Sequence, residues 1–377
     1  MNIEKNSEKI DSYVCDFLRF PLTVMVVFLH LPALETNIQG GGNFIKEIIG
    51  WVGGIAVPVF FIISGYYFFY HAETFTLSVY KSKLEKRIKS LIIPYVVWTI
   101  LALVFVFSFV VGGVIIHNKS TDVIWVWIAE SIKLQVFYSS ASMISYDNLN
   151  WFGNPRLLAV PYLQPFWYVR DLIFMVLVSP LIYYVIKKMN SIIIIFFMLL
   201  YISGLNLPMS GLTSTSLFFF SLGAYLAINK KSITDFAANR LLEYLSMGLF
   251  LLSFTVIMSY GKNVISYNFY PLFVISLTVL LFNLMKKKVL KNGIQVNSFS
   301  MRVKKYSFFI YASHAIFGIY VANVFIKRLL PLCHSDLYLI LLYMVFGLLS
   351  IMVCIVAFEL LNRILPKTMF QMLTGGR

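Results

Sequence analysis

Charged residues and cysteines are both scarce in this chain of 377 residues. Asp, Glu, Lys and Arg make up only 12% of it, whereas 59% of the residues are hydrophobic. That balance departs far from the composition of a soluble globular domain. It predicts that most of the chain is embedded in a membrane. The three cysteines, Cys15, Cys333 and Cys354, are too few and too scattered for a disulfide framework or a Cys-x-x-Cys metal site.

Signals for several other kinds of function are missing too. The sequence has no glycine-rich phosphate loop, no nucleophile elbow and no histidines at metal-ligand spacing, so we assign no metal. Residues 1–12 are polar and of mixed charge, unlike a cleavable signal peptide, and we expect them to form a cytoplasmic tail. The net charge of +15 is dispersed over short loops, which argues against a nucleic-acid partner.

Ten apolar windows of membrane-spanning length follow one another along the chain. We place them near residues 13–34, 48–70, 91–113, 166–186, 191–207, 212–228, 241–260, 267–285, 306–326 and 336–362. The sequence therefore predicts an all-α integral membrane protein, a bundle of about ten transmembrane helices in one domain covering residues 1–377. The short windows within 191–228 leave open a count that differs by one hairpin.

The basic residues predict how this bundle is oriented. With the N-terminus in the cytoplasm, the inner segments carry 22 of the 31 lysines and arginines and the outer segments carry seven. Cytoplasmic loops of membrane proteins show this excess of positive charge. We therefore expect a multi-pass protein of the plasma membrane with both termini in the cytoplasm.

One outer segment, residues 114–165, is long and rich in aromatic residues. Within it, 122–137 is expected to form a helix that lies in the membrane interface. Aromatic faces on an outer loop can stack on sugars, but Trp and Tyr also gather at headgroup depth in any multi-pass protein, so both interpretations stay open. The aromatic residues are Trp125, Trp127, Tyr138, Tyr146, Trp151, Phe152 and Tyr162.

Two ionisable residues interrupt the first apolar window. Arg19 and His30 are eleven residues apart, which on a helix is three turns plus about 20°, so both side chains lie on one face about 16 Å apart. An ionisable residue inside a membrane span is costly and marks a functional site unless a neighbour pairs with it. Asp16 is such a neighbour for Arg19, but it leaves His30 unexplained.

Five strings, in order, resemble acyltransferase family 3, whose members are integral membrane enzymes that typically O-acetylate surface sugars. The first is the Arg19 and His30 pair with ten residues between them. The others are Val57-Pro-Val-Phe-Phe-Ile-Ile-Ser-Gly65-Tyr66, Lys86-Arg-Ile-Lys-Ser-Leu-Ile-Ile-Pro94-Tyr95, Pro165-Phe-Trp-Tyr-Val-Arg-Asp-Leu172 and Ser307-Phe-Phe-Ile-Tyr311-Ala-Ser-His314. Each string alone is weak, and the resemblance rests on all five together.

The resemblance implies an acyl-CoA donor, acetyl-CoA above all, on the cytoplasmic side. It favours Lys86, Arg87 and Lys89 as the donor-binding residues, although the same basic run is what any inner loop carries. Many members have two arginines three apart at this place, where this chain has either Arg87 followed by Ser90 or Lys86 followed by Lys89, so that lysines could share the role. One large branch has a Trp-Ser-Leu string followed by Glu, whereas this chain reads Trp167-Tyr-Val-Arg-Asp171, which puts the carboxylate role in doubt.

The chemistry of acyl transfer assigns roles to the first span. A hydroxyl acceptor needs a base near neutral pH, which histidine supplies, and an anionic donor needs positive charge. We expect His30 to be the general base or a transient acyl carrier and Arg19 to position the donor. Residues expected to line the substrate pathway are Ser64, Trp167, Tyr168, Arg170, Asp171, Ser307, Tyr311 and His314.

Each of these pathway residues also has a purely structural interpretation. Asp171 either orients His30 or neutralises its neighbour Arg170. Ser307, Tyr311 and His314 share one helical face, which serves either the transfer pathway or hydrogen bonds between helices. Ser64 stands before Gly65, where ordinary helix packing explains both residues.

The function expected from these observations is a membrane-bound O-acyltransferase. It would move an acyl group, acetyl above all, from cytoplasmic acyl-CoA to a hydroxyl of a cell-surface carbohydrate or its lipid-linked precursor. Its partners would then be the bilayer, the carbohydrate acceptor and the machinery that assembles glycans. The alternative is a transporter or flippase for a glycan or a lipid-linked intermediate, since intramembrane Arg, Asp and His also build such pathways. A structural partner of a glycan assembly complex would explain the composition but not the Arg19 and His30 face.

Overall fold

The computed structural model describes residues 2–32, 34, 41–70, 74–118, 120–131, 133–139, 141–153, 155–205, 209–332 and 335–376. Within these residues the chain is almost entirely helical, in agreement with the predicted fold class. The α-helices are α1 (Asn2–His30), α2 (Gly41–Gly53), α3 (Ala56–Phe69), α4 (Leu77–Arg87), α5 (Ile93–Ile116), α6 (Asp122–Ser131), α7 (Trp167–Leu177), α8 (Ser179–Met189), α9 (Ser191–Ser203), α10 (Ser214–Ile228), α11 (Ile233–Ala237), α12 (Arg240–Tyr260), α13 (Val264–Asn292), α14 (Phe299–Val303), α15 (Ser307–Ser313), α16 (Ile319–Leu329), α17 (Asp336–Ile364) and α18 (Lys367–Thr374).

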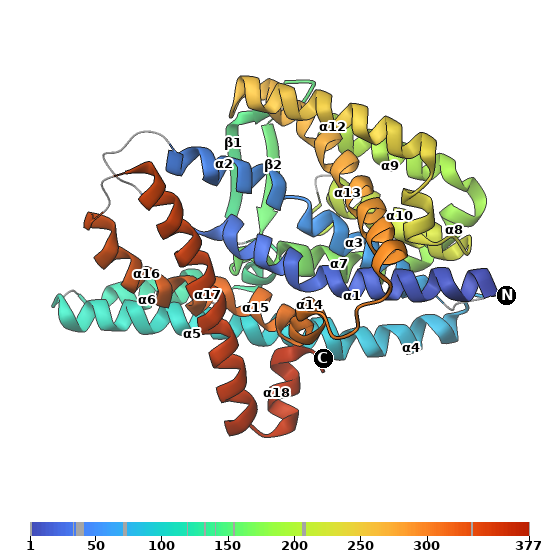
Figure 1. Ribbon diagram of the computed structural model, residues 1–377. Coiled ribbons are helices and arrows are strands. Elements are labelled where there is room, and N and C mark those ends of the chain that lie inside the picture. The colour runs from blue at the N-terminus through green and yellow to red at the C-terminus, as the bar shows by residue number, and fades with distance from the viewer. Residues whose placement is uncertain are drawn as a thin grey trace.

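Shorter helical turns connect several of these helices. Two are π-helical, η1 (Ile88–Ile92) and η5 (His314–Gly318), and four are 3₁₀-helical, η2 (Leu134–Phe137), η3 (Gln164–Phe166), η4 (Lys304–Tyr306) and η6 (Leu330–Leu332). Figure 1 shows α1 running across the molecule, with its N-terminus at one side and α2, α6 and α16 at the other.

Seven helices of the described residues are long and apolar enough to cross a membrane, and the count is eight if the bent pair α7 and α8 forms one span. The seven coincide with predicted spans 13–34, 48–70, 91–113, 241–260, 267–285, 306–326 and 336–362. The predicted spans 191–207 and 212–228 coincide with α9 and α10, which are 13 and 15 residues long. That is short of the ~20 residues that a span needs, so the count of ten is not confirmed. The last residues of the predicted spans 13–34 and 191–207 lie partly outside the described residues.

The predicted fourth span, 166–186, is not one straight helix. It breaks between α7 and α8, whose axes differ by 65°. Pro180 stands in the first turn of α8, where its missing N–H costs nothing, but its ring prevents α7 from continuing through this point. The break leaves the first half of this segment, with Tyr168, Arg170 and Asp171, free to take its own direction.

Residues 114–165, which the sequence predicts to form an outer segment, contain a β-hairpin that was not predicted. Strands β1 (Ala141–Leu149) and β2 (Pro155–Val160) pair antiparallel from Ala141 opposite Val160 to Ser145 opposite Arg156, with an irregularity before Leu149. Strand β1 lies against α13. Of the helix expected over 122–137, the structure shows α6, which ends at Ser131, followed by the shorter turn η2. The place of this helix in the membrane interface stays a prediction.

Glycines allow α3 and α10 to pack with their backbones in contact. A Cβ atom on Gly65 would lie 2.1 Å from the carbonyl oxygen of Phe220, and one on Gly223 would lie 2.1 Å from the carbonyl oxygen of Ile62. A larger residue cannot fit at either position, as in other close helix contacts within membranes. This contact supports the packing interpretation of Gly65 and fixes the neighbouring Ser64 in place on α3.

Candidate functional site

A cavity of about 230 Å³ lies among α1, α3, α7, α15 and the junction between α4 and α5. Apolar side chains, among them Phe60, Leu91 and Phe308, form part of its wall. Its polar lining comes from helices that are far apart in the sequence, and it consists of Arg19, Thr23, Ser64, Tyr67, Arg87, Tyr168, Ser307 and Tyr311. We call this the arginine cavity.

The arginine cavity carries an excess of positive charge. Arg19 and Arg87 both line it, and no carboxylate is among the described residues of its wall. The Asp16 carboxylate lies 3.5 Å from the Arg19 guanidinium, but it also pairs with Lys304 at 2.5 Å, so it offsets the charge of Arg19 only in part. The Arg87 guanidinium lies over the ring of Phe68, 5.8 Å from its centroid. Two guanidinium groups whose charge is only partly offset make the arginine cavity a candidate site for an anion.

Hydroxyl groups form another part of the wall of the arginine cavity. The Ser64 and Tyr168 hydroxyls are 3.2 Å apart, which joins α3 to α7. The ring of Tyr168 meets that of Tyr311 edge to face, with centroids 6.0 Å apart. Tyr311 in turn donates its hydroxyl hydrogen to the carbonyl oxygen of Pro165. These contacts hold the wall in one conformation, because each side chain is fixed by a neighbour on another helix.

Two histidines, His30 and His314, pack against each other next to Tyr311. The rings of His30 and His314 lie 5.2 Å apart between centroids, and the ring of Tyr311 lies 6.2 Å from that of His314. Each histidine donates from Nδ1 to a backbone carbonyl, His30 to Val26 at 2.8 Å and His314 to Tyr311 at 2.7 Å. In the neutral form each ring therefore keeps the lone pair on Nε2. The Nε2 atom of His314 is buried without a hydrogen-bond partner in the described structure.

Both π-helical turns lie directly beside these functional side chains. The turn η1 begins at the residue after Arg87, and η5 begins at His314 itself. A π-turn interrupts the regular hydrogen bonding of an α-helix and is frequent at functional sites. In this chain η1 directly follows Arg87 and contains Leu91, both of which line the arginine cavity, and η5 begins three residues after Tyr311, which lines it too.

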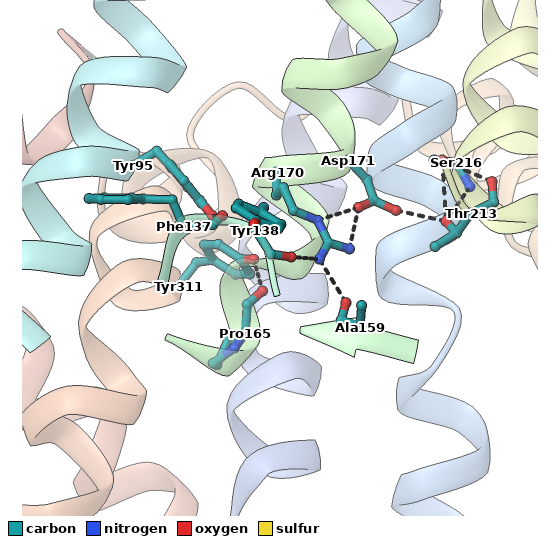
Figure 2. A network of polar contacts seen from close by, with 10 residues as sticks. All are labelled: Tyr95, Phe137, Tyr138, Ala159, Pro165, Arg170, Asp171, Thr213, Ser216 and Tyr311. Carbon is teal, nitrogen blue, oxygen red and sulfur yellow. Dashed lines mark hydrogen bonds and ion pairs between the residues drawn. The ribbon is translucent and has the colours of Figure 1, made fainter. Parts of the chain in front are cut away.

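Arg170 and Asp171 form a separate, fully buried network (Figure 2). The Asp171 carboxylate accepts from Nε of Arg170 at 2.9 Å and from Nη2 at 2.7 Å, and it accepts from the Thr213 hydroxyl at 2.8 Å. Arg170 also donates from Nη1 to the carbonyl oxygens of Tyr138 at 2.6 Å and Ala159 at 2.7 Å. This network ties α7 to α10 and to the base of the hairpin.

A family model described as an acyltransferase domain matches residues 13–359 of the chain. The chain belongs to acyltransferase family 3. No curated protein and no solved structure matches it. The match runs from α1 to α17 and includes every residue of the arginine cavity and both histidines. Membership of acyltransferase family 3 and the apolar helices together make the chain a multi-pass membrane acyltransferase.

The geometry divides the residues that the resemblance to acyltransferase family 3 had suggested. Six of them line the arginine cavity: Arg19, Ser64, Arg87, Tyr168, Ser307 and Tyr311. His30 and His314 form the adjoining pair. Five lie elsewhere: Lys86 and Lys89 are exposed, Trp167 packs against Phe61 with ring centroids 6.5 Å apart, and Arg170 and Asp171 belong to the buried network. For Asp171 the structure shows the second of the two interpretations, a carboxylate that neutralises Arg170.

Two further polar residues of the cavity wall were missed in the sequence. Thr23 is four residues after Arg19 on α1, and Tyr67 is three residues after Ser64 on α3. Both spacings place a side chain on the same helical face as a residue already singled out, so helical periodicity alone could have found them. Neither residue type stood out, because Thr and Tyr are common in membrane helices.

Proposed function

We propose that this membrane acyltransferase moves an acyl group, acetyl above all, from acyl-CoA to a hydroxyl of a cell-surface carbohydrate or its lipid-linked precursor. The observation that carries the proposal is the pair of guanidinium groups, Arg19 and Arg87, in a cavity whose wall includes Tyr311, which packs beside the two neighbouring histidines. A diphosphate-bearing thioester donor and a base are what acyl transfer to a hydroxyl requires, and both have a place here.

The donor phosphates fit the positive end of the arginine cavity. Guanidinium groups bind phosphate oxygens in a bidentate fork, and an apolar surrounding strengthens such bonds. Arg87 is the residue of the basic run that lines the cavity, whereas Lys86 and Lys89 are exposed. We therefore assign the phosphate contacts to Arg19 and Arg87, and we give the two lysines the lesser role of attracting the anionic donor to the cavity mouth.

The length of the pantetheine arm supports this placement. Arg19 and His30 are eleven residues apart on α1, a rise of about 16 Å. Pantetheine holds about as many chain bonds as four amino-acid residues, which extend to ~14 Å. A donor whose phosphates contact Arg19 therefore brings its thioester close to the histidine pair, with Ser64, Tyr168 and Tyr311 along its path.

The reaction then needs one proton acceptor. The hydroxyl oxygen of the acceptor attacks the thioester carbonyl carbon while His30 Nε2 takes the hydroxyl proton, and coenzyme A departs as a thiolate to which that proton returns. The bond from His30 Nδ1 to the Val26 carbonyl fixes the ring so that Nε2 carries the lone pair. The alternative route, in which His30 Nε2 first accepts the acyl group and then passes it to the hydroxyl, uses the same nitrogen.

The excess of basic residues in alternate loops supports cytoplasmic termini and a plasma-membrane location. With this orientation Arg19 lies towards the cytoplasm and His30 towards the outer face, so that the donor enters from within and the acceptor from outside. The glycan assembly machinery would supply that acceptor. The transporter and flippase alternative is not favoured, because the family match indicates an acyltransferase.

The test is mass spectrometry of surface glycans from a deletion strain. The strain is complemented with wild-type protein, with His30→Ala, with His117→Ala or with nothing, at matched amounts of protein in the membrane. His117 is an exposed histidine directly after the end of α5 and does not line the arginine cavity, so it serves as the matched control. We expect acyl esters with wild type and His117→Ala, and their loss with His30→Ala.

Equal acylation in all four strains would overturn the proposal. If glycan export rather than acylation fell without the protein, the flippase would take its place. Purified protein provides a second readout, because release of free thiol from acetyl-CoA should depend on His30 and on an added carbohydrate acceptor.

A further inference from the structure

A second cavity, of about 360 Å³, lies between the first turns of α1 and the end of α3. Its wall consists of Glu8, Lys9, Asp11, Ser12, Tyr66, Tyr67 and Tyr70. Its volume falls within the range of ~300–1000 Å³ typical of small-molecule sites. We call it the tyrosine cavity. Tyr67 also lines the arginine cavity, so the two cavities share a wall.

The polar face of α1 joins the two cavities to the histidine pair. Glu8, Ser12, Arg19, Thr23 and His30 succeed one another at spacings of four and seven residues, which keeps all five within a sector of about 60°. Glu8 and Ser12 line the tyrosine cavity, and Arg19 and Thr23 line the arginine cavity. Glu8 is as far from Arg19 as Arg19 is from His30, about 16 Å along the axis. A ligand held at Arg19 with one arm towards His30 has its other arm directed at the tyrosine cavity.

The aromatic side chains of the tyrosine cavity offer ring surfaces rather than polar groups. The rings of Tyr66 and Tyr70 stack, with centroids 5.1 Å apart and planes 28° apart. The hydroxyl of Tyr66 donates to the Asp11 carboxylate at 3.2 Å. The hydroxyl of Tyr70 forms a hydrogen bond with the Glu8 carboxylate. Because the hydroxyls point to α1, the ligand meets aromatic faces, which favour a flat ring system.

The charges of the tyrosine cavity narrow the choice of ligand. Asp11 is saturated, since it accepts from the backbone N–H groups of Ile233 and Thr234 and from the hydroxyls of Ser232, Thr234 and Tyr66. Glu8 has lone pairs left after its bond to Tyr70 and is exposed. Lys9 adds one positive charge. This set provides an acceptor for an amino group on a flat ring and a cation for a phosphate.

We propose that the tyrosine cavity binds the adenosine 3′-phosphate half of the acyl-CoA donor, with adenine against the rings of Tyr66, Tyr67 and Tyr70. The N6 amino group of adenine donates to Glu8, and the 3′-phosphate accepts from Lys9. The proposal rests on the proposed function, because it takes the donor to be a coenzyme A thioester. It assigns the three parts of that donor to three successive places along α1.

The experiment measures binding of adenosine 3′,5′-bisphosphate, which lacks pantetheine, to the purified full-length protein in detergent by titration calorimetry. Tyr70→Leu should weaken binding roughly 5- to 150-fold, the worth of one base stacked on an aromatic ring. Tyr70→Phe keeps the ring and should bind within about threefold of wild type. Tyr244→Leu, at an exposed tyrosine of α12 outside both cavities, is the matched control and should leave affinity unchanged.

A second measurement needs no variant and so does not depend on folding. Inosine 3′,5′-bisphosphate carries a carbonyl oxygen where adenine has N6, and the Glu8 carboxylate repels it. Wild-type protein should bind it at least tenfold more weakly than the adenosine compound. Equal affinity for both compounds, or an unchanged affinity in Tyr70→Leu, would overturn the adenine assignment. So would choline displacing the bisphosphate, since that result would make the tyrosine cavity a cage for organic cations.

Acyl transfer separates this proposal from the proposed function. With acetyl-CoA as donor, Tyr70→Leu should raise KM, whereas with acetyl-pantetheine it should behave as wild type. Transfer with both donors and no effect of Tyr70→Leu would refute the adenine site alone. Binding of the bisphosphate that depends on Tyr70, without any acyl transfer, would refute the proposed function alone.

Discussion

Removal of the Asp171 carboxylate should destabilise the protein strongly. The Arg170 and Asp171 side chains are 3% and 0% exposed, and the carboxylate accepts two hydrogen bonds from the guanidinium. Asp171→Asn leaves the guanidinium buried without a counter-charge, which typically costs about 3–5 kcal/mol. The two backbone carbonyls that Arg170 also contacts cannot neutralise that charge.

The expected change in melting temperature depends on the chain length. Unfolding entropy of about 2.1 cal/mol/K per residue, over 377 residues, gives ~0.8 kcal/mol/K, so a loss of 3–5 kcal/mol lowers Tm by ~4–6 °C. The assay is thermal unfolding of the purified protein followed by intrinsic fluorescence. Asp235→Asn is the matched control: Asp235 pairs with Lys286 at 2.5 Å but its side chain is 46% exposed, and such pairs contribute about 1 kcal/mol or less.

A double substitution tests the reasoning further. Arg170→Met with Asp171→Leu removes both charges and leaves no uncompensated ion, so it should cost less than the sum of the two single losses. It still leaves the Tyr138 and Ala159 carbonyls without their donor, at about 1–3 kcal/mol each where they are buried. A Tm of Asp171→Asn equal to that of the Asp235→Asn control would refute the argument.

Three further predictions concern packing and the cavity. Gly65→Ala should destabilise the fold by the ~1–3 kcal/mol of an overpacked contact and so reduce the yield of folded protein in size-exclusion chromatography. Gly113 has open space around it, so Gly113→Ala should leave the yield unchanged. Equal yields of the two variants would contradict the close packing. Arg87→Gln should raise the donor KM about 10- to 150-fold through loss of charged hydrogen bonds, and Lys86→Gln much less; steady-state kinetics decide, and equal effects would place the phosphates elsewhere. His314→Phe keeps an aromatic ring at this place but removes both ring nitrogens. It should lower kcat at least tenfold and leave the donor KM unchanged. An unchanged kcat would limit His314 to packing.

The sequence was sufficient to predict where most helices lie. Long apolar windows predicted the seven long helices, because a bilayer leaves a spanning chain no other way to satisfy its backbone hydrogen bonds. It could not predict the break between Leu177 and Ser179, since a proline bends some membrane helices and leaves others whole. It also missed the hairpin, because residues 141–160 are outside the apolar windows and their strands are stabilised by pairing and by Arg170, neither of which is a local signal.

The candidate site was predictable to the extent that it lies along one helix. Arg19 and His30 lie on one face of α1 at a spacing that any α-helix fixes, and the structure places Thr23 between them. What other helices add to that face depends on tertiary packing. His314 lies at the junction of α15 and η5, nearly three hundred residues later, and only the folded bundle brings its ring within 5.2 Å of the His30 ring.

Arg87 shows why helical periodicity alone could not choose among the basic residues of the third long helix. In the sequence, Lys86, Arg87 and Lys89 belong to one basic run, and all three were candidates for donor binding. In the structure Arg87 and Leu91, four residues apart and so on one side of the helix, both line the cavity, while Lys86 and Lys89 remain exposed. Helical periodicity shows that Arg87 and Lys86 point in different directions, but it does not show which direction leads to the cavity. That depends on how this helix packs against α1, α3 and α7, which is a property of the folded bundle.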